Sequence, residues 1–125
     1  MNTNALLDFA AVTVESLDVV SLARELLTSE QITRDGRTAR TLAKSEGLTA
    51  VLTAVRAGGS VSEHSAPGPV IIVPLIGTAI FSGGDGQRGP RQVSVGHMLC
   101  IGKGQRHEVA ATEDCAFLII IGLQS

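Results

Sequence analysis

The chain has 125 residues, a formal net charge of −2 and 44% hydrophobic residues, which suits one globular domain with a single core. Aromatic residues make up only 2%, with three Phe and neither Tyr nor Trp, so the core must be built from aliphatic side chains. Nucleic acid is excluded as an expected partner, because no run of Lys and Arg is present to neutralise phosphates and stacking platforms for single strands are missing.

The apolar segments are also too short to cross a membrane. The longest run covers residues 117–121, whereas a spanning helix needs about 20 apolar residues. The N-terminus has no basic segment followed by an apolar stretch, so we expect no signal peptide, no membrane partner and a cytoplasmic location. Two cysteines, Cys100 and Cys115, are too few for a disulfide scaffold.

The first part of the chain predicts an arm followed by one helix. Residues 1–13 show no clear period, and residues 16–31 show a helical one. The apolar positions expected to share one helix face are Leu17, Val20, Ala23 and Leu27. Ser16 or Asp18 is placed to cap the start of this helix.

After Asp35-Gly36 the hydrophobic period changes to two, which indicates strands. The predicted strands cover residues 38–44, 48–56, 60–64, 70–75, 78–82, 91–95, 98–101, 107–111 and 115–122. Many short strands with Gly-rich turns are typical of a sandwich or a barrel. Pro74 lies inside one strand and predicts an edge, a bend or a bulge there. We therefore expect an all-β fold, a small antiparallel β-barrel over residues 38–125, preceded by an arm and a short N-terminal helix over residues 1–37.

The strand predicted at residues 48–56 is apolar on both faces. One face carries Leu48, Ala50, Leu52 and Ala54, and the other carries Thr49, Val51, Thr53 and Val55. This pattern predicts a sheet that is covered on both sides. One short helix cannot cover so much apolar surface, so we expect a homodimer.

A glycine motif between two predicted strands is a false lead. Residues 84–89 spell G-x-G-x-x-G, but Pro90 and a strand follow where a dinucleotide fingerprint requires a helix. We interpret the segment as a hairpin loop.

The first histidine stretch has Gly58, His64 and Gly77 in the spacing of a known motif, G-x5-H-x-H-x3,4-E-x6-G. On these residues the chain resembles the cupin family. The motif's second His and its Glu fall on Ala66 and Val70 here.

The second stretch matches the other cupin motif, G-x5-P-x-G-x2-H-x3-N, through Gly96, Gly104 and His107. Gly102 stands in place of the Pro and Ala111 in place of the Asn. The resemblance covers about residues 38–122. It implies a small barrel of jelly-roll type in which the motif histidines point into the barrel mouth.

The departures from the motifs bear on the metal. The family's usual site has three His and one Glu, and this resemblance retains only His64 and His107. A catalytic metal normally has at least three protein ligands. We therefore assign no cofactor. If the two histidines hold a divalent ion such as Zn, Ni, Fe or Mn, we expect it to bind weakly.

Four residues are the expected contacts of a ligand in the barrel mouth: His64, His107, Met98 and Cys100. His97 and Gln105 are further possible ligands. The Gly-rich turn interrupts the strand alternation, so the sequence does not fix which face of the sheet their side chains lie on. A histidine pair can transfer protons near neutral pH or hydrogen-bond an anionic or carbonyl group. The lining of Val, Ile, Leu and Ala indicates a small, largely apolar ligand.

Three functions follow from these observations. The first in rank is binding of a small molecule in the barrel mouth beside a degenerate two-His metal site. The second is a divalent-metal-dependent enzyme of oxygenase or isomerase type. The third is a non-catalytic structural or interaction barrel, which a mouth packed shut by Leu and Ile would favour. No catalytic residue is assigned.

Overall fold

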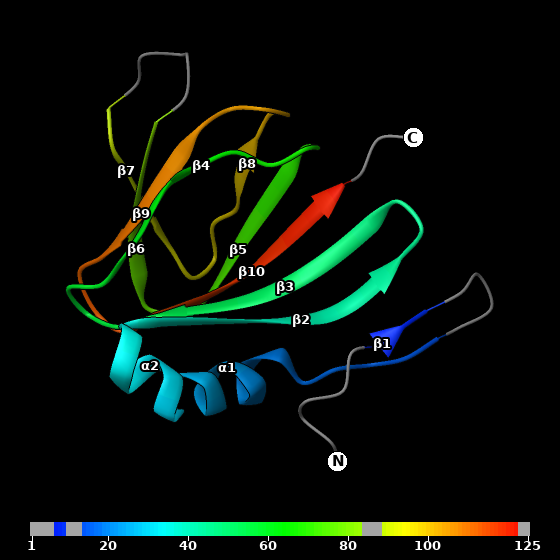
Figure 1. Ribbon diagram of the computed structural model, residues 1–125, viewed down its shortest axis with the longest axis horizontal. Coiled ribbons are helices and arrows are strands. Elements are labelled where there is room, and N and C mark those ends of the chain that lie inside the picture. Colours follow the sequence, from blue (N-terminus) through cyan, green and yellow to red (C-terminus); the bar gives the residue numbers. More distant parts are fainter. Residues whose placement is uncertain (1–6, 10–13, 84–88, 123–125) are drawn as a thin grey trace.

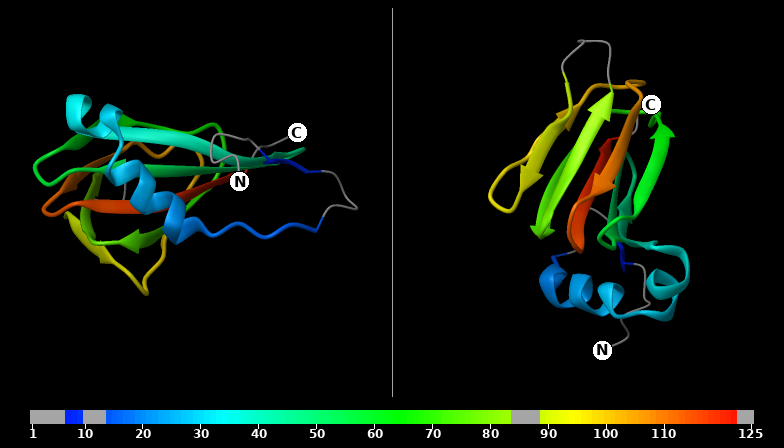
Figure 2. Two further views of the ribbon diagram at one scale, coloured as in Figure 1. Left: turned by 90° about the horizontal axis from the view of Figure 1, so that it is seen from below. Right: turned by 90° about the vertical axis from the view of Figure 1, so that its left-hand side faces the viewer.

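The computed structural model describes residues 7–9, 14–83 and 89–122, except for the side chains of residues 63 and 64. Two β-sheets face each other, and two short helices lie beneath the outer side of one of them (Figures 1 and 2). Among the described helices, none has the length and apolar character needed to cross a bilayer.

The described residues form ten strands and two helices. The helices are α1 (Val19–Leu27) and α2 (Glu30–Asp35). The first sheet has the strand order β1 (Leu7–Asp8), β2 (Arg37–Ser45), β3 (Leu48–Val55), β10 (Cys115–Gly122), β5 (Val70–Ile76) and β8 (Leu99–Ile101). The second sheet has the order β4 (Ser60–His64), β9 (His107–Ala111), β6 (Thr78–Gly83) and β7 (Arg91–Ser94). All nine strands predicted from residue 38 onward are present, with bounds that differ by at most one residue.

The closed barrel is the part of the fold prediction that needs correction. Among the described strands, ladders form within each sheet and none joins the two sheets. The architecture is therefore a jelly-roll sandwich that stays mostly β. All pairings are antiparallel except the short parallel contact of β1 with β2. Residues 84–88 of the predicted hairpin loop lie outside the described residues, and the strands on either side, β6 and β7, pair as neighbours.

The single predicted helix is in fact two. The carboxylate of Asp18 accepts a hydrogen bond from the backbone N–H of Ser21 at 3.1 Å and caps α1, as one of the two expected caps. The hydroxyl of Ser29 accepts from the N–H of Ile32 at 3.4 Å and starts α2, so a second cap interrupts the helical period. The hydrogen bonds from Ser21 also hold the pKa of the Asp18 carboxyl below its ordinary value.

Two apolar clusters occupy the two faces of the first sheet. The inner cluster lies between the sheets and includes the rings of Phe81 and Phe117, whose centroids are 5.6 Å apart in an edge-to-face contact. The outer cluster lies between the first sheet and the helices. Its buried helical members are Leu22, Ala23, Leu26 and Ile32. The buried face of α1 is therefore rotated from the predicted one, of which Ala23 is buried and Leu27 packs against the cluster while partly buried. The helix buries this face because its residues pack against the outer face of the first sheet, and the position of that sheet is not encoded in the periodicity of the helix.

Two irregularities shape the sheets. The ladder of β10 with β5 shifts register between Ala116, which pairs with Ile76, and Phe117, which pairs with Pro74. The expectation of a bulge at this proline is confirmed. At Gly77, with φ of 71°, the chain leaves the first sheet and enters β6 of the second. A Cβ there would collide with the carbonyl oxygen of Asp114 and lie 3.1 Å from the Cα of Cys115.

The corner at Gly77 gives a test of this packing. We expect Gly77→Ala to lower the free energy of unfolding by about 2–5 kcal/mol, because left-handed strain and a backbone collision add. Gly47→Ala is the matched control, since Gly47 has φ of 84° and nothing within 4 Å of an added Cβ. The control should lose only about 1–2 kcal/mol from strain. Denaturant unfolding measures both, and equal losses would contradict the collision.

Cys115 gives a second test. Burial, with the charges of Glu113 and Asp114 as lesser causes, raises the pKa of its thiol to about 11. In the unfolded chain the thiol ionises near pH 8.5. Below that pH both states are protonated and the thiol contributes nothing. Between about pH 9 and 11 only the unfolded state loses the proton, so unfolding should become easier by up to about 1.4 kcal/mol per pH unit.

Denaturant unfolding across this pH range measures the slope for three proteins. We expect Cys115→Ala to flatten it, although the cavity lowers stability at neutral pH. Cys100→Ala is the control, because Cys100 is exposed, and it should keep the slope of the unaltered protein. A steep slope that survives in Cys115→Ala would assign the effect to another group.

Candidate functional site

The second sheet brings the two motif histidines to directly opposed positions. The Cα of His64 in β4 pairs with the Cα of His107 in β9, after a register shift that begins at Val61. Opposed positions of an antiparallel ladder share a face of the sheet. The backbone therefore agrees with the expectation that these two positions meet at one end of the sandwich. The imidazole of His64 lies outside the described side chains.

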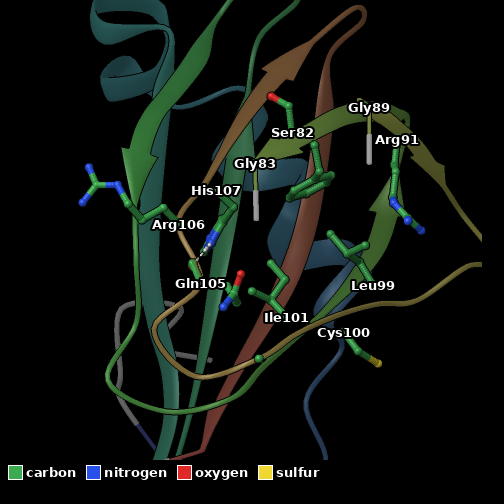
Figure 3. Close-up of a pocket in the computed structure, with 12 residues that line it drawn as sticks. Ser82, Gly83, Gly89, Arg91, Leu99, Cys100, Ile101, Gln105, Arg106 and His107 are labelled. Atoms are coloured by element: carbon green, nitrogen blue, oxygen red, sulfur yellow. Dashed lines mark hydrogen bonds between the residues drawn. The ribbon is translucent and has the colours of Figure 1, made fainter. Parts of the chain in front are cut away.

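His107 is buried, with 7% of its surface exposed. Its Nδ1 lies 3.3 Å from the carbonyl oxygen of Gln105, as the dashed line in Figure 3 shows. A carbonyl only accepts, so Nδ1 is the donor, and in the neutral ring the lone pair is then on Nε2. The distance is long for a hydrogen bond of this kind. Its effect is to orient the ring and select the tautomer.

A pocket of about 310 Å³ opens at this end of the sandwich, and we call it the mouth pocket. Figure 3 shows Leu99 and Ile101 on one side of it and His107 on another. Arg91 pairs with Phe81 across the β6–β7 ladder and shares its face. Arg106 points away from the pocket (Figure 3). The mouth pocket thus has an apolar floor and a polar rim.

A second cavity of about 270 Å³, the inter-sheet cleft, lies between the two sheets near β2 and β4. Its apolar lining residues are Ala39, Val61, Ile72, Val109, Phe117 and Ile119. Its polar lining residues are Arg37, Thr38, Thr53 and His107. His107 is the residue that these two cavities share. The imidazole therefore stands where the mouth pocket and the inter-sheet cleft adjoin.

Sequence reasoning missed Thr53 and Arg37. In the described part of the chain the buried polar residues are Thr53 and His107, each 7% exposed, and both line the inter-sheet cleft. Alternation did assign Thr53 to one face of its strand, but the sequence does not say which face is inward. Arg37 was placed outside the predicted strand by one residue.

Two other predicted contacts are placed less favourably. Met98 is 60% exposed and precedes β8, and among described residues it lines neither the mouth pocket nor the inter-sheet cleft. Cys100 contributes to the rim of the mouth pocket, but its thiol points away from the centre in Figure 3. The reason is alternation, because its neighbours Leu99 and Ile101 pack against the inner cluster. His97 is exposed, with Nδ1 3.4 Å from the hydroxyl of Ser94.

The described residues do not fit a tight site for a divalent metal. Ala66 packs against the inner cluster and Val70 is 3% exposed within it, so both motif positions face the interior without a donor atom. Within residues 7–9, 14–83 and 89–122, leaving aside the side chains of 63 and 64, no three His, Cys, Asp or Glu gather closely enough to hold an ion. A three-ligand site of the usual kind is not formed by this set.

Neither protein-family models nor curated proteins match the sequence, whereas solved structures do. A cupin superfamily protein from Desulfitobacterium hafniense superposes with a TM-score of 0.71 at 21% identity, over 90% of this chain and 94% of that one. An RmlC-like cupin from Desulfovibrio desulfuricans gives 0.69 at 24% identity, over 88% and 97%. A DMSP lyase from Ruegeria pomeroyi gives 0.63 at 18% identity, over 80% and 53%. The chain has the cupin fold, as the two motif stretches led us to expect.

Proposed function

We propose that this small protein of cupin fold binds a small molecule in its interior, and that binding does not require a metal ion. The observation that carries the proposal is the position of His107. It is a buried polar side chain shared by the mouth pocket and the inter-sheet cleft. A polar side chain in the wall of a largely apolar cavity is typical of a ligand site.

The chemistry available to His107 suits a carbonyl or acidic group. In the neutral ring, Nε2 accepts a hydrogen bond from a ligand hydroxyl or carboxylic acid. In the protonated ring, it donates to a carbonyl or carboxylate. Because histidine ordinarily changes charge near neutral pH, the same nitrogen can serve as an acid or a base if the ligand is transformed. The walls supply apolar contacts.

The second candidate is a divalent-metal-dependent enzyme of oxygenase or isomerase type. Two observations favour keeping it. The opposed positions of His64 and His107 are those of motif ligands, and a lyase is among the solved structures of this fold. The third candidate, a structural barrel with a packed mouth, agrees poorly with cavities of about 310 and 270 Å³.

A thermal-shift screen of small organic acids and carbonyl compounds tests the proposal on chelator-treated protein. We expect binders to raise the melting temperature equally with and without chelator, because a ligand stabilises whatever state it binds. His107→Ala should abolish the shift, whereas His97→Ala should keep it, since His97 is exposed and outside both cavities. A shift that appears only after a divalent ion is restored would favour the enzyme.

The family's ligand positions provide a gain-of-function prediction. We expect Ala66→His combined with Val70→Glu to raise the affinity for Zn²⁺ by roughly a hundredfold or more, because two donors join the motif histidines. The buried glutamate should lower stability without metal, and added metal should restore it. Isothermal titration measures the affinity.

The control for this change is Ala66→Leu with Val70→Met, which adds bulk without an imidazole or a carboxylate. Equal zinc affinity in the two double variants would show that the motif positions do not converge. Tight stoichiometric zinc in the unaltered protein would reveal a ligand that the motif alignment misses.

The proposed partner is a second copy of the chain. One row across the outer face of the first sheet is Ala50, Ile120, Ile71 and Cys100, and the helical cluster includes none of these four. Nearby Leu48 is 40% exposed. An apolar sheet face of this kind is best covered by a symmetric dimer.

Light scattering over a wide concentration range should therefore report a homodimer. Leu48→Lys should weaken it by placing a charge on the apolar face. Gln92→Lys is the control, because it adds the same charge at an exposed position of β7 in the other sheet. A monomer at every concentration would contradict the dimer.

A further inference from the structure

We infer that the inter-sheet cleft takes a small organic acid, with its carboxylate at Arg37, a ring-sized apolar middle against Phe117 and a hydroxyl or carbonyl group toward His107. This inference rests on the proposed function and names the class of ligand. It also assigns binding to the cleft rather than to the mouth pocket.

The inter-sheet cleft carries a positive charge at its edge. Arg37 is the fixed charge among the described lining residues, and that lining includes no carboxylate. The guanidinium makes no salt bridge with a described residue. Arg37 is an exposed residue, so an anion can reach its charge from solvent at the edge of the cleft. A carboxylate fits best, since the planar fork of a guanidinium binds it through two parallel hydrogen bonds.

The position of Arg37 is held by the second sheet. Its Nη1 donates to the carbonyl oxygen of Ser60 at 3.2 Å, which links β2 of the first sheet to β4 of the second. One of five N–H donors is used in this link, and the others face no described acceptor. The link holds the charged end of the side chain at the cleft in advance of binding, so less order is lost when an anion arrives.

Thr53 provides the second observation. It pairs with Ala39 on one side and with Phe117 on the other, so it lies in the wall of the cleft. Thr53 is a polar residue with 7% of its surface exposed. Its hydroxyl gives the wall of the cleft a group that can hydrogen-bond a polar atom of the ligand.

The separation of the two polar ends sets the length of the ligand. Ser60, which Arg37 contacts, pairs with Ala110, whereas His107 pairs with His64. Three residues of β9 separate these levels, which amounts to about 10 Å along the strand. The walls between them are aliphatic apart from Phe117, Thr38 and Thr53. A volume of about 270 Å³ leaves room for one ring or a short branched chain.

Three probes separate the parts of this inference: 4-hydroxyphenylacetate, its amide and phenylacetate. Titration calorimetry on the chelator-treated full chain should find the hydroxy acid binding best. We expect the amide to bind about tenfold more weakly or worse, because it lacks the charge. Phenylacetate should also bind more weakly, because it lacks the group that reaches His107.

Variants then locate the carboxylate. Arg37→Gln should reduce binding of the acid about tenfold or more and leave the amide nearly unchanged. Thr53→Val should weaken all three probes. Arg91→Gln is the matched control, since it removes the same charge from the mouth pocket, and it should bind the acid as the unaltered protein does.

A measurement on the unaltered protein covers the case in which a variant fails to fold. Methyl NMR should show the hydroxy acid shifting Val61, Ile72 and Val109 of the cleft more than Leu99 of the mouth pocket. Equal affinity for acid and amide would overturn the organic-acid assignment, as would loss of acid binding in Arg91→Gln but not in Arg37→Gln. No binding of the three probes at millimolar concentration would overturn it too. In each case, the thermal-shift screen on chelator-treated protein still tests whether any small molecule binds without a metal, so the proposed function is tested independently of the organic-acid assignment.

Discussion

The contact between Phe81 and Phe117 joins the two sheets at the centre of the sandwich. These are two of the three phenylalanines in a chain without Tyr or Trp, and they bury the largest surfaces in an otherwise aliphatic core. Phe81 lines the mouth pocket and Phe117 lines the inter-sheet cleft. The ring pair therefore packs one sheet against the other, with one ring in the wall of each cavity.

Small side chains elsewhere in the inner cluster keep these spaces from filling. The cluster is made largely of Val, Ile and Ala, and branched aliphatic residues standing on two separate sheets leave room near the sheet edges. His107 lies at the boundary between the spaces, oriented by the carbonyl of Gln105. The imidazole therefore contributes a polar group to the walls of both cavities.

At two of the motif's ligand positions the interior has apolar side chains in place of metal-binding ones. Ala66 and Val70 occupy motif positions with side chains that pack against the inner cluster. Replacing a carboxylate by valine removes both a ligand and the negative charge that would offset a dication. Arg37 lines the inter-sheet cleft, and under the inference above its guanidinium pairs with an anionic ligand.

The sequence by itself determined the order and bounds of the strands, because alternation and Gly-rich turns are local signals. The expectation that the stretches around His64 and His107 meet came from the resemblance to the cupin motifs, and the strand register itself is a property of the tertiary structure. The break between α1 and α2 was not predicted, because Ser29 caps the second helix within a continuous helical pattern.

Only the tertiary structure decided which face of each strand is inward. That decision placed Thr53 and Arg37 at the inter-sheet cleft and turned the thiol of Cys100 away from the mouth pocket. Alternation divides the residues of a strand between two faces but does not say which face is buried between the sheets. That is decided by the packing of one sheet against the other and against the helices.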